Sequence, residues 1–199
     1  MENKPKVIIG LPVNGKMIAQ TTASIAHAII GAKGKVMNLV MHVSCDIVSS
    51  RTWIVNRAIE QKATHLLFVD SDMVFGHDVI DRMLAHKKEI VGVEYNRRRL
   101  PLEPTHKTLE GVEPSKTELY KGKYAGTGLM LIDLSIFETL GKPKTEGERP
   151  TPWFNFGRDS QGSLVMGEDA WFCNVARDAG FDTWIDPTIE VGHIGEHTF

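Results

Sequence analysis

Residues 64–75 read THLLFVDSDMVF, and the fold is predicted from this segment outward. Within it, residues 65–69 are apolar enough to form a strand that is buried on both faces, as in a parallel sheet covered by helices. The triplet Asp70-Ser71-Asp72 ends the strand. Because side chains alternate along an extended chain, Asp70 and Asp72 point the same way and Ser71 points the opposite way. The stretch therefore predicts a buried central strand that ends in two neighbouring carboxylates.

Strand-like and helix-like patterns alternate on both sides of this strand. Apolar residues at helical spacing alternate with short apolar and β-branched runs that end in turn residues. Strands are expected over residues 6–11, 36–43, 65–69 and 90–95, and helices over residues 18–30, from Ser49-Ser50 to residue 59, and over residues 77–86. This β-α-β-α-β-α-β order predicts an α/β fold with a Rossmann-like, mostly parallel central sheet flanked by helices.

The pattern becomes less regular after Asn96, where an arginine run and a proline-containing loop begin. The second half is expected to be an α+β elaboration of the first. Its short strands are expected over residues 105–109, 118–121, 129–132, 183–185 and 188–191, with helices near residues 135–140 and over residues 168–179. No repeat, low-complexity tract or linker divides the sequence, so one domain is expected.

The composition limits the classes of function. Lys plus Arg total 23 and Asp plus Glu total 25, so the net charge of −2 provides no broad positive surface for duplex nucleic acid. No apolar run is long enough to span a membrane, and the first residues do not read as a signal peptide. The two cysteines, Cys45 and Cys173, indicate neither a disulfide framework nor a zinc cluster, so a cytoplasmic protein is expected.

The carboxylates of Asp70 and Asp72 suggest a metal site at the end of the buried strand. In an open α/β sheet, ligands bind beyond the carboxyl ends of the strands. Two carboxylates there repel each other unless a cation compensates them, and a divalent ion that also binds phosphate and water meets that need. The alternative is that the carboxylates cap the following helix, although Gly76 and Asp78 lie closer to its start.

Four segments together resemble one enzyme family. They are THLLFVDSDMVF at residues 64–75 with Arg51 and Asn56 upstream, YAGTGLMLID at 124–133, GEDAWFCNVARDAGF at 167–181 and VGHIG at 191–195. In this order they resemble the nucleotide-sugar-dependent glycosyltransferases of the GT-A fold, and among these the large family-2 group. Their DXD motif matches Asp70-Ser71-Asp72. The resemblance implies one GT-A domain over residues 1–199, in which residues 1–96 bind the nucleotide and residues 97–199 bind the donor sugar and the acceptor.

The resemblance also implies a reaction and a metal. A sugar would move from a nucleoside diphosphate sugar, UDP- or GDP-linked, to a nucleophile, usually a hydroxyl, on a glycan, lipid, protein or small molecule. Mn²⁺ or Mg²⁺ would stabilise the charge that develops on the departing diphosphate. The implied ligands are Asp72 directly, Asp70 through water unless it contacts the ribose, and His193, whose imidazole favours Mn²⁺. The alternative for His193 is a surface or core histidine.

Glu168 and Asp169 begin the helix of the third resembling segment. The resemblance implies that Asp169 is the general base that takes the proton of the acceptor hydroxyl, a role that only an inverting transfer needs. Glu168 would hold a hydroxyl group of the acceptor or the donor. The alternative is purely structural, because the helix dipole favours acidic side chains in the first turn.

The nucleotide and the donor sugar would contact residues at the strand ends. The implied contacts are Pro12, Val13, Asp46 (or Ser44), Arg51, Asp70, Ser71, Gly126 and Gly128. Arg51 would reach the base or a phosphate, unless it is a solvated helix charge. The two glycines would permit close approach of the backbone to the ligand, unless they mark a β-bulge.

Two further groups of residues are candidates for substrate binding. One of Arg97, Arg98 and Arg99 is expected to grip the diphosphate or the acceptor, because guanidinium groups bind phosphate oxygens well, although such runs are usually solvated loops. Trp153, Phe154 and Phe156 either stack on a sugar or pack within their loop.

Two other functions are compatible with the sequence. A sugar-phosphate nucleotidyltransferase also uses metal-binding aspartates, but the LPVNGK stretch at residues 11–16 is short for a loop that holds a triphosphate. A catalytically silent nucleotide- or glycan-binding module would keep the fold, although Asp70, Asp72, Asp169 and His193 are all present. A P-loop enzyme is not expected, because the sequence contains no GxxxxGK[ST] motif.

Overall fold

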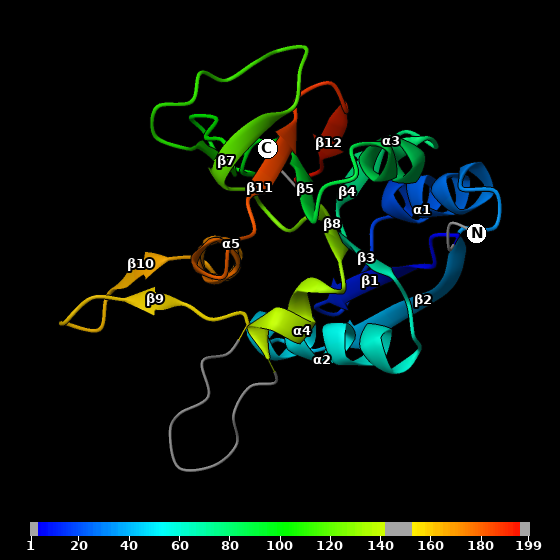
Figure 1. The fold of residues 1–199 in the computed structure, drawn as a ribbon, viewed down its shortest axis with the longest axis horizontal. Helices are drawn as coiled ribbons and strands as arrows, with labels where there is room; N and C mark the ends of the chain where they lie inside the picture. Colours follow the sequence, from blue (N-terminus) through cyan, green and yellow to red (C-terminus); the bar gives the residue numbers. More distant parts are fainter. Residues whose placement is uncertain (1–3, 142–152, 196–199) are drawn as a thin grey trace, which may run out of the picture.

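A mixed sheet forms the centre of the computed structural model, which describes residues 4–141 and 153–195. Its strand order is β2-β1-β3-β8-β5-β11-β7-β6 (Figure 1). The strands are β1 (Val7–Val13), β2 (Val36–Val43), β3 (His65–Val69), β5 (Ile90–Val93), β6 (Lys107–Thr108), β7 (Tyr120–Tyr124), β8 (Leu129–Asp133) and β11 (Thr183–Asp186). The helices are α1 (Ala19–Gly31), α2 (Ile47–Glu60), α3 (Val79–Ala85), α4 (Ile136–Leu140) and α5 (Glu168–Asp178).

Most of the strands run in one direction. β1 pairs in parallel with β2 and β3, and β11 pairs in parallel with β5. β8 is antiparallel to both β3 and β5, so β5 runs in the same direction as β3. The mostly parallel α/β sheet that the sequence predicts is therefore confirmed. One feature was not predicted: β8 comes from the second half of the chain and separates β3 from β5.

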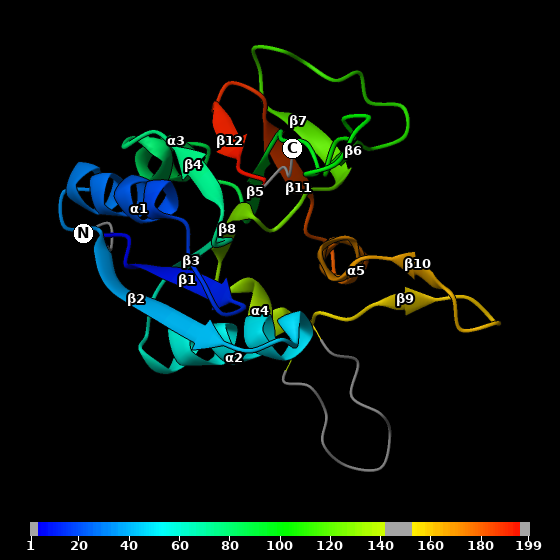
Figure 2. The same ribbon diagram turned by 180° about the vertical axis from the view of Figure 1, so that it is seen from behind.

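Helices cover both faces of the sheet and bury two apolar cores. One core joins Leu66 and Phe68 of β3 to α2, α4 and α5. The other core joins Leu67 and Val69 to α1 and α3. Figure 1 shows α1 and α3 on one side of β1 and β3 and α2 and α4 on the other, and Figure 2 shows the same layers from behind. β3 is thus buried on both faces, as its sequence predicts.

Some limits of the elements differ from the predicted ones. The sequence predicts that β1 ends at residue 11, but the strand continues to Val13. Pro12 is tolerated there because β1 pairs with β3 only as far as Gly10. The short hairpin of β9 (Gly157–Arg158) and β10 (Leu164–Met166), which the sequence does not predict, extends away from the sheet (Figure 1). Among the described residues, no helix combines the length and apolar character needed to cross a membrane.

A second, small sheet joins the end of the chain to the end of β3. β4 (Met73–Phe75) follows the Asp70-Ser71-Asp72 triplet and pairs antiparallel with β12 (Val191–His193), with Met73 opposite His193. The Ile194 N–H donates a hydrogen bond to the Asp72 carbonyl oxygen (2.9 Å). The strand predicted over residues 188–191 thus lies slightly later, and its position brings His193 to the triplet.

Candidate active site

The candidate site lies where β3 and β5 end and β8 begins. The Asp70 N–H donates to the Gly128 carbonyl, and the Gly128 N–H donates to the Tyr95 hydroxyl, each at 2.9 Å. A Cβ atom at Gly126 or Gly128 would lie 2.2 or 2.5 Å from that hydroxyl oxygen. Both positions therefore require glycine because Tyr95 approaches them closely. Burial, and then the charge of Asp70, raises the pKa of Tyr95 above its ordinary value, so its hydroxyl stays neutral.

Asp72 and His193 form the first pair of functional side chains. Asp72 is buried, and its Oδ1 has no hydrogen-bond partner within the described residues. The His193 Nε2 lies 3.4 Å from this oxygen, and the His193 Nδ1 lies 2.8 Å from the Asn96 carbonyl. A carbonyl can only accept, so Nδ1 carries a proton and, in the neutral ring, Nε2 carries the lone pair. Burial alone would lower the pKa of His193, but its contacts with the Asp72 carboxylate and the Asn96 carbonyl raise it overall.

A guanidinium group also reaches Asp72. The Arg98 Nη1 lies 2.6 Å from the second carboxylate oxygen, Oδ2, and half of the Arg98 side chain is exposed. The negative charge at the end of β3 is therefore compensated by a cation, as its burial requires. Of the three consecutive arginines, Arg98 is the one in contact with the triplet.

Arg51 joins Asp70 to Glu168. Its side chain is only 3% exposed, with Nη2 3.1 Å from Asp70 Oδ1 and Nε 3.4 Å from Glu168 Oε1. The guanidinium also lies over the Phe68 ring, 5.2 Å from its centroid. The alternative of a solvated helix charge is therefore wrong for Arg51. The arginine connects α2, the end of β3 and the start of α5, and it compensates two of the acidic groups that the sequence predicts for the site.

Replacement of Arg51 by methionine is expected to destabilise the protein by about 3 kcal/mol, because it leaves two partly buried carboxylates without their counter-ion. This corresponds to a fall in melting temperature of roughly 6–12 °C. Arg57→Met is the matched control in the same helix, since Arg57 pairs with Glu60 at the surface and its loss is expected to cost less than about 1 kcal/mol. Equal effects of the two substitutions in thermal or urea unfolding would contradict the bridging role of Arg51.

Asp169 lies at a small cavity together with Asp70 of the DXD triplet and His193 of β12. The cavity has a volume of about 270 Å³, and its walls include Asp70, Thr127, Glu168, Asp169 and His193. Burial, and then the charge of Glu168, raises the pKa of Asp169 to about 6. One Asp169 oxygen accepts the N–H of Ala170 (2.7 Å). A carboxylate with this pKa is suited to accept a proton near neutral pH.

The residues of the first pair fit a divalent cation. An unpartnered carboxylate oxygen and an imidazole nitrogen with a free lone pair face each other at Asp72 and His193. The second ring nitrogen of His193 is held by a carbonyl, as is usual for a metal-binding histidine. In the described part of the chain, no three His, Cys, Asp or Glu side chains gather as a complete metal site. Asp70 itself is paired with Arg51, so the remaining ligands would have to come from substrate and water.

Three of the predicted nucleotide contacts, Pro12, Val13 and Asp46, lie at or just beyond the ends of β1 and β2. Pro12 and Val13 are buried at the end of β1. Asp46 caps α2, because its Oδ1 accepts the N–H groups of Val48 and Ser49. The sequence predicts Ser49-Ser50 as the start of this helix, and that prediction is wrong by one turn. Ser71 lies beside the same region, and its carbonyl accepts the N–H that precedes α1.

Two of the three loop aromatics, Trp153 and Phe154, pack inside the protein, and Phe156 is partly buried. Phe154 is fully buried and stacks on Phe172 of α5, and it meets Phe68 edge to face. Trp153 is 3% exposed and donates its indole N–H to the Gly141 carbonyl. For these two rings the packing interpretation is therefore correct, and neither offers a face to a sugar.

Comparison with known proteins identifies the fold. No protein-family model matches the sequence, and no curated protein matches it. Among solved structures, A197 from STIV matches with a TM-score of 0.62 at 14% identity, over 96% of this chain and 86% of that chain. GalNAc-T7 with UDP, GalNAc and Mn²⁺ matches with a TM-score of 0.61 at 13% identity, over 98% of this chain and 45% of that chain. S. aureus TarS 1–349 in complex with UDP-GlcNAc matches with a TM-score of 0.55 at 13% identity, over 96% of this chain and 60% of that chain.

The chain has a glycosyltransferase fold of the GT-A type, as its sequence motifs imply. It spans 45% of the GalNAc-T7 chain and 60% of the TarS chain.

Proposed function

We propose that the protein is a metal-dependent glycosyltransferase that moves a sugar from a nucleoside diphosphate sugar to an acceptor hydroxyl, with inversion at the anomeric carbon. The observation that carries this proposal is the cavity shared by Asp70, His193 and Asp169. It places His193, which pairs with Asp72 as a candidate cation ligand, on the same cavity as a carboxylate suited to accept a proton. The neighbours of the same fold support it, because one was crystallised with UDP and Mn²⁺ and another with UDP-GlcNAc.

Asp72 and His193 would hold Mn²⁺ or Mg²⁺ directly. Asp70 would bind the ion through a water molecule or would contact the ribose of the nucleotide. When bound, the ion supplies Lewis-acid stabilisation of the negative charge on the diphosphate. Asp72 Oδ1 needs no rearrangement to accept a cation, because it has no hydrogen-bond partner among the described residues. Asp72 Oδ2 would exchange its ion pair with Arg98, and the half-exposed Arg98 side chain can turn away toward solvent.

Asp169 performs the proton transfer in this proposal. The acceptor oxygen attacks the anomeric carbon and forms a new C–O bond, while the bond to the diphosphate breaks and its electron pair leaves with the diphosphate. The hydroxyl proton passes to a carboxylate oxygen of Asp169. Glu168 lies beside Arg51, its charge raises the pKa of Asp169, and its carboxylate can accept a hydrogen bond from a sugar hydroxyl.

The division of the chain follows from these assignments. Residues 1–96 would bind the nucleotide along the ends of β1 and β2, with Pro12 and Val13 as an apolar wall and Asp46 at the start of α2. Residues 97–199 would bind the donor sugar and the acceptor. Gly126 and Gly128 belong to this second part, and the Gly128 backbone lies beside Asp70, where the donor sugar would meet the end of β3.

The proposal is tested by the melting temperature of the protein with UDP, GDP or CDP, each with Mn²⁺ and with EDTA. One diphosphate is expected to raise it, and only with the metal. At a hundred times the dissociation constant, the stabilisation is about 2.7 kcal/mol, or roughly 5–10 °C. Chromatography then measures whether the matching nucleotide sugar is consumed in a metal-dependent reaction. Such consumption distinguishes an enzyme from a catalytically silent binding module. Stabilisation by a diphosphate in EDTA would contradict the assigned metal role.

A further inference from the structure

An open cavity lies beyond Asp72 and His193. It has a volume of about 740 Å³ and is lined by residues 94–99, His106 and the β12 segment, among others. We infer that it binds the acceptor, and that the acceptor carries a phosphate group which Arg97 holds. This inference rests on the proposed function, because it assumes that the donor occupies the ends of β1 and β3.

The position of the cavity favours the acceptor over the donor. The strand order places β1 and β2 on one side of β3, and β5 and β6 on the other. The cavity-lining residues 94–99 follow β5, and His106 precedes β6. A nucleotide along β1 and β2 would therefore lie on the far side of the Asp70–Asp72 triplet from this cavity. The space over β5 remains for the second substrate.

The charges in the cavity favour an anion. Arg97, Arg98 and Arg99 line it together with His193, and Glu94 is the carboxylate among the lining residues. Arg98 is engaged by Asp72 and Arg99 by Glu103. Within the described residues, the Arg97 guanidinium forms no side-chain hydrogen bond and no ion pair, and Glu103 is the carboxyl group whose pKa it helps to lower. A guanidinium that is free for two parallel N–H···O bonds is a good ligand for a phosphate.

Arg97 also connects this cavity to the proposed base. Arg97, Tyr95 and His193 line both the 740 Å³ cavity and the smaller 270 Å³ cavity that contains Asp169. A phosphate on Arg97 would thus leave a hydroxyl of the same molecule, a few bonds away, in the cavity of Asp169. The arrangement therefore selects acceptors in which the nucleophilic hydroxyl lies close to a phosphate ester.

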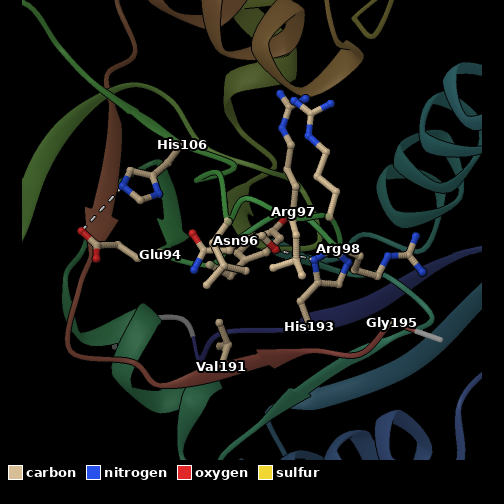
Figure 3. A pocket seen from close by; sticks show the side chains of 12 residues that line it. Glu94, Asn96, Arg97, Arg98, His106, Val191, His193 and Gly195 are labelled. Atoms are coloured by element: carbon tan, nitrogen blue, oxygen red, sulfur yellow. Dashed lines mark hydrogen bonds and ion pairs between the residues drawn. The ribbon is translucent and has the colours of Figure 1, made fainter. Parts of the chain in front are cut away.

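The remaining walls are consistent with this orientation. Figure 3 shows Glu94 and His106 together at one end of the cavity, away from Arg97, Arg98 and His193. The Glu94 carboxylate accepts a hydrogen bond from the Tyr120 hydroxyl (2.5 Å) and lies 3.8 Å from His106 Nε2, so it is engaged away from the arginines. Leu100 and Leu102 are 83% and 66% exposed at the cavity. They would lie along an alkyl chain if the phosphate belonged to a lipid.

The test is calorimetric titration of glycerol 3-phosphate into the full chain saturated with UDP and Mn²⁺. We expect binding, and we expect Arg97→Gln to weaken it at least about tenfold, as loss of a charged hydrogen-bond donor predicts. The affinity for UDP should change by less than about twofold. Arg99→Gln is the matched control, since its guanidinium is held by Glu103, and it should weaken binding by less than about threefold.

The outcomes separate this inference from the proposed function. If UDP binds with Mn²⁺ but glycerol 3-phosphate does not, or if UDP displaces it, the acceptor assignment is wrong and the proposed function stands. If UDP fails to bind, both are wrong. Octyl phosphate distinguishes the source of the group: tighter binding than glycerol 3-phosphate identifies a lipid phosphate, and equal binding identifies a soluble phosphate ester. Stronger binding of glucuronate than of either would overturn the choice of phosphate over carboxylate.

Discussion

Asparagine in place of Asp72 is expected to abolish the Mn²⁺-dependent binding of the nucleoside diphosphate and to lower turnover by at least about a thousandfold. The amide keeps the shape of the side chain but removes the charge that would hold the cation. Loss of the ion costs several kcal/mol of stabilisation of the departing diphosphate. The measurements are Mn²⁺ titration by electron paramagnetic resonance and the rate of donor consumption at saturating metal.

The control for this variant is Asp78→Asn. Asp78 is an exposed aspartate at the start of α3, just beyond the β4–β12 pair, and its side chain forms no capping hydrogen bond. This control should bind Mn²⁺ and turn over donor as the wild type does. An Asp72→Asn protein that melts like the wild type and still binds Mn²⁺ with UDP would refute the metal assignment.

Asparagine in place of Asp169 is expected to lower the rate by about 10²–10⁴-fold, because an amide cannot accept the proton of the acceptor hydroxyl. Binding of UDP with Mn²⁺ should be retained, since Asp169 is assigned to the acceptor side. In the wild type, the ionised form of Asp169 is the active one, and its pKa is about 6. The kcat/KM for the acceptor should therefore be constant above this pH and fall as the pH decreases through about 6.

A second variant tests the cause of the raised pKa. The charge of Glu168 raises the pKa of Asp169, so Glu168→Gln should move the acid limb of the kcat/KM profile to lower pH. Asp169→Asn should remove the limb altogether. If the limb is unchanged in both variants, Asp169 is not the base, although the fold and the metal site would be unaffected by that result.

The parts of the fold that were predicted correctly have strong local signals. The apolar run of β3 and the helical spacing before and after it are sufficient to indicate a covered parallel sheet. The acidic start of α5 and its end near Gly180 were also found from local patterns, since the helix covers Glu168–Asp178. In each case the residues that determine the element are neighbours in the sequence.

The parts that were missed depend on contacts between distant segments. β8 lies between β3 and β5 although the chain reaches it only after residues 94–128, which include β6 and β7. The Tyr95 hydroxyl occupies the space left by the missing side chains of Gly126 and Gly128. No pattern within either segment reveals this contact. His193 was a single histidine in a short apolar segment, and only its pairing with β4 places it at Asp72.

Arg51 is the exception, because a local signal could have located it. Ile54, Val55 and Ala58 form the buried face of α2, and Arg51 lies one turn earlier on the same face. A charged residue on the apolar face of a helix is buried when the helix packs, so it needs a partner of opposite charge. That position indicates a buried arginine with acidic partners, whereas its partners, Asp70 and Glu168, could be identified only from the structure.

The most direct test of the central claim is a crystal of the protein grown with UDP and Mn²⁺ and measured at a wavelength where manganese scatters anomalously. We expect one strong anomalous peak between Asp72 and His193, in contact with the diphosphate. A manganese peak at another position, with Asp72 still paired to Arg98 in the presence of bound UDP, would contradict the central claim.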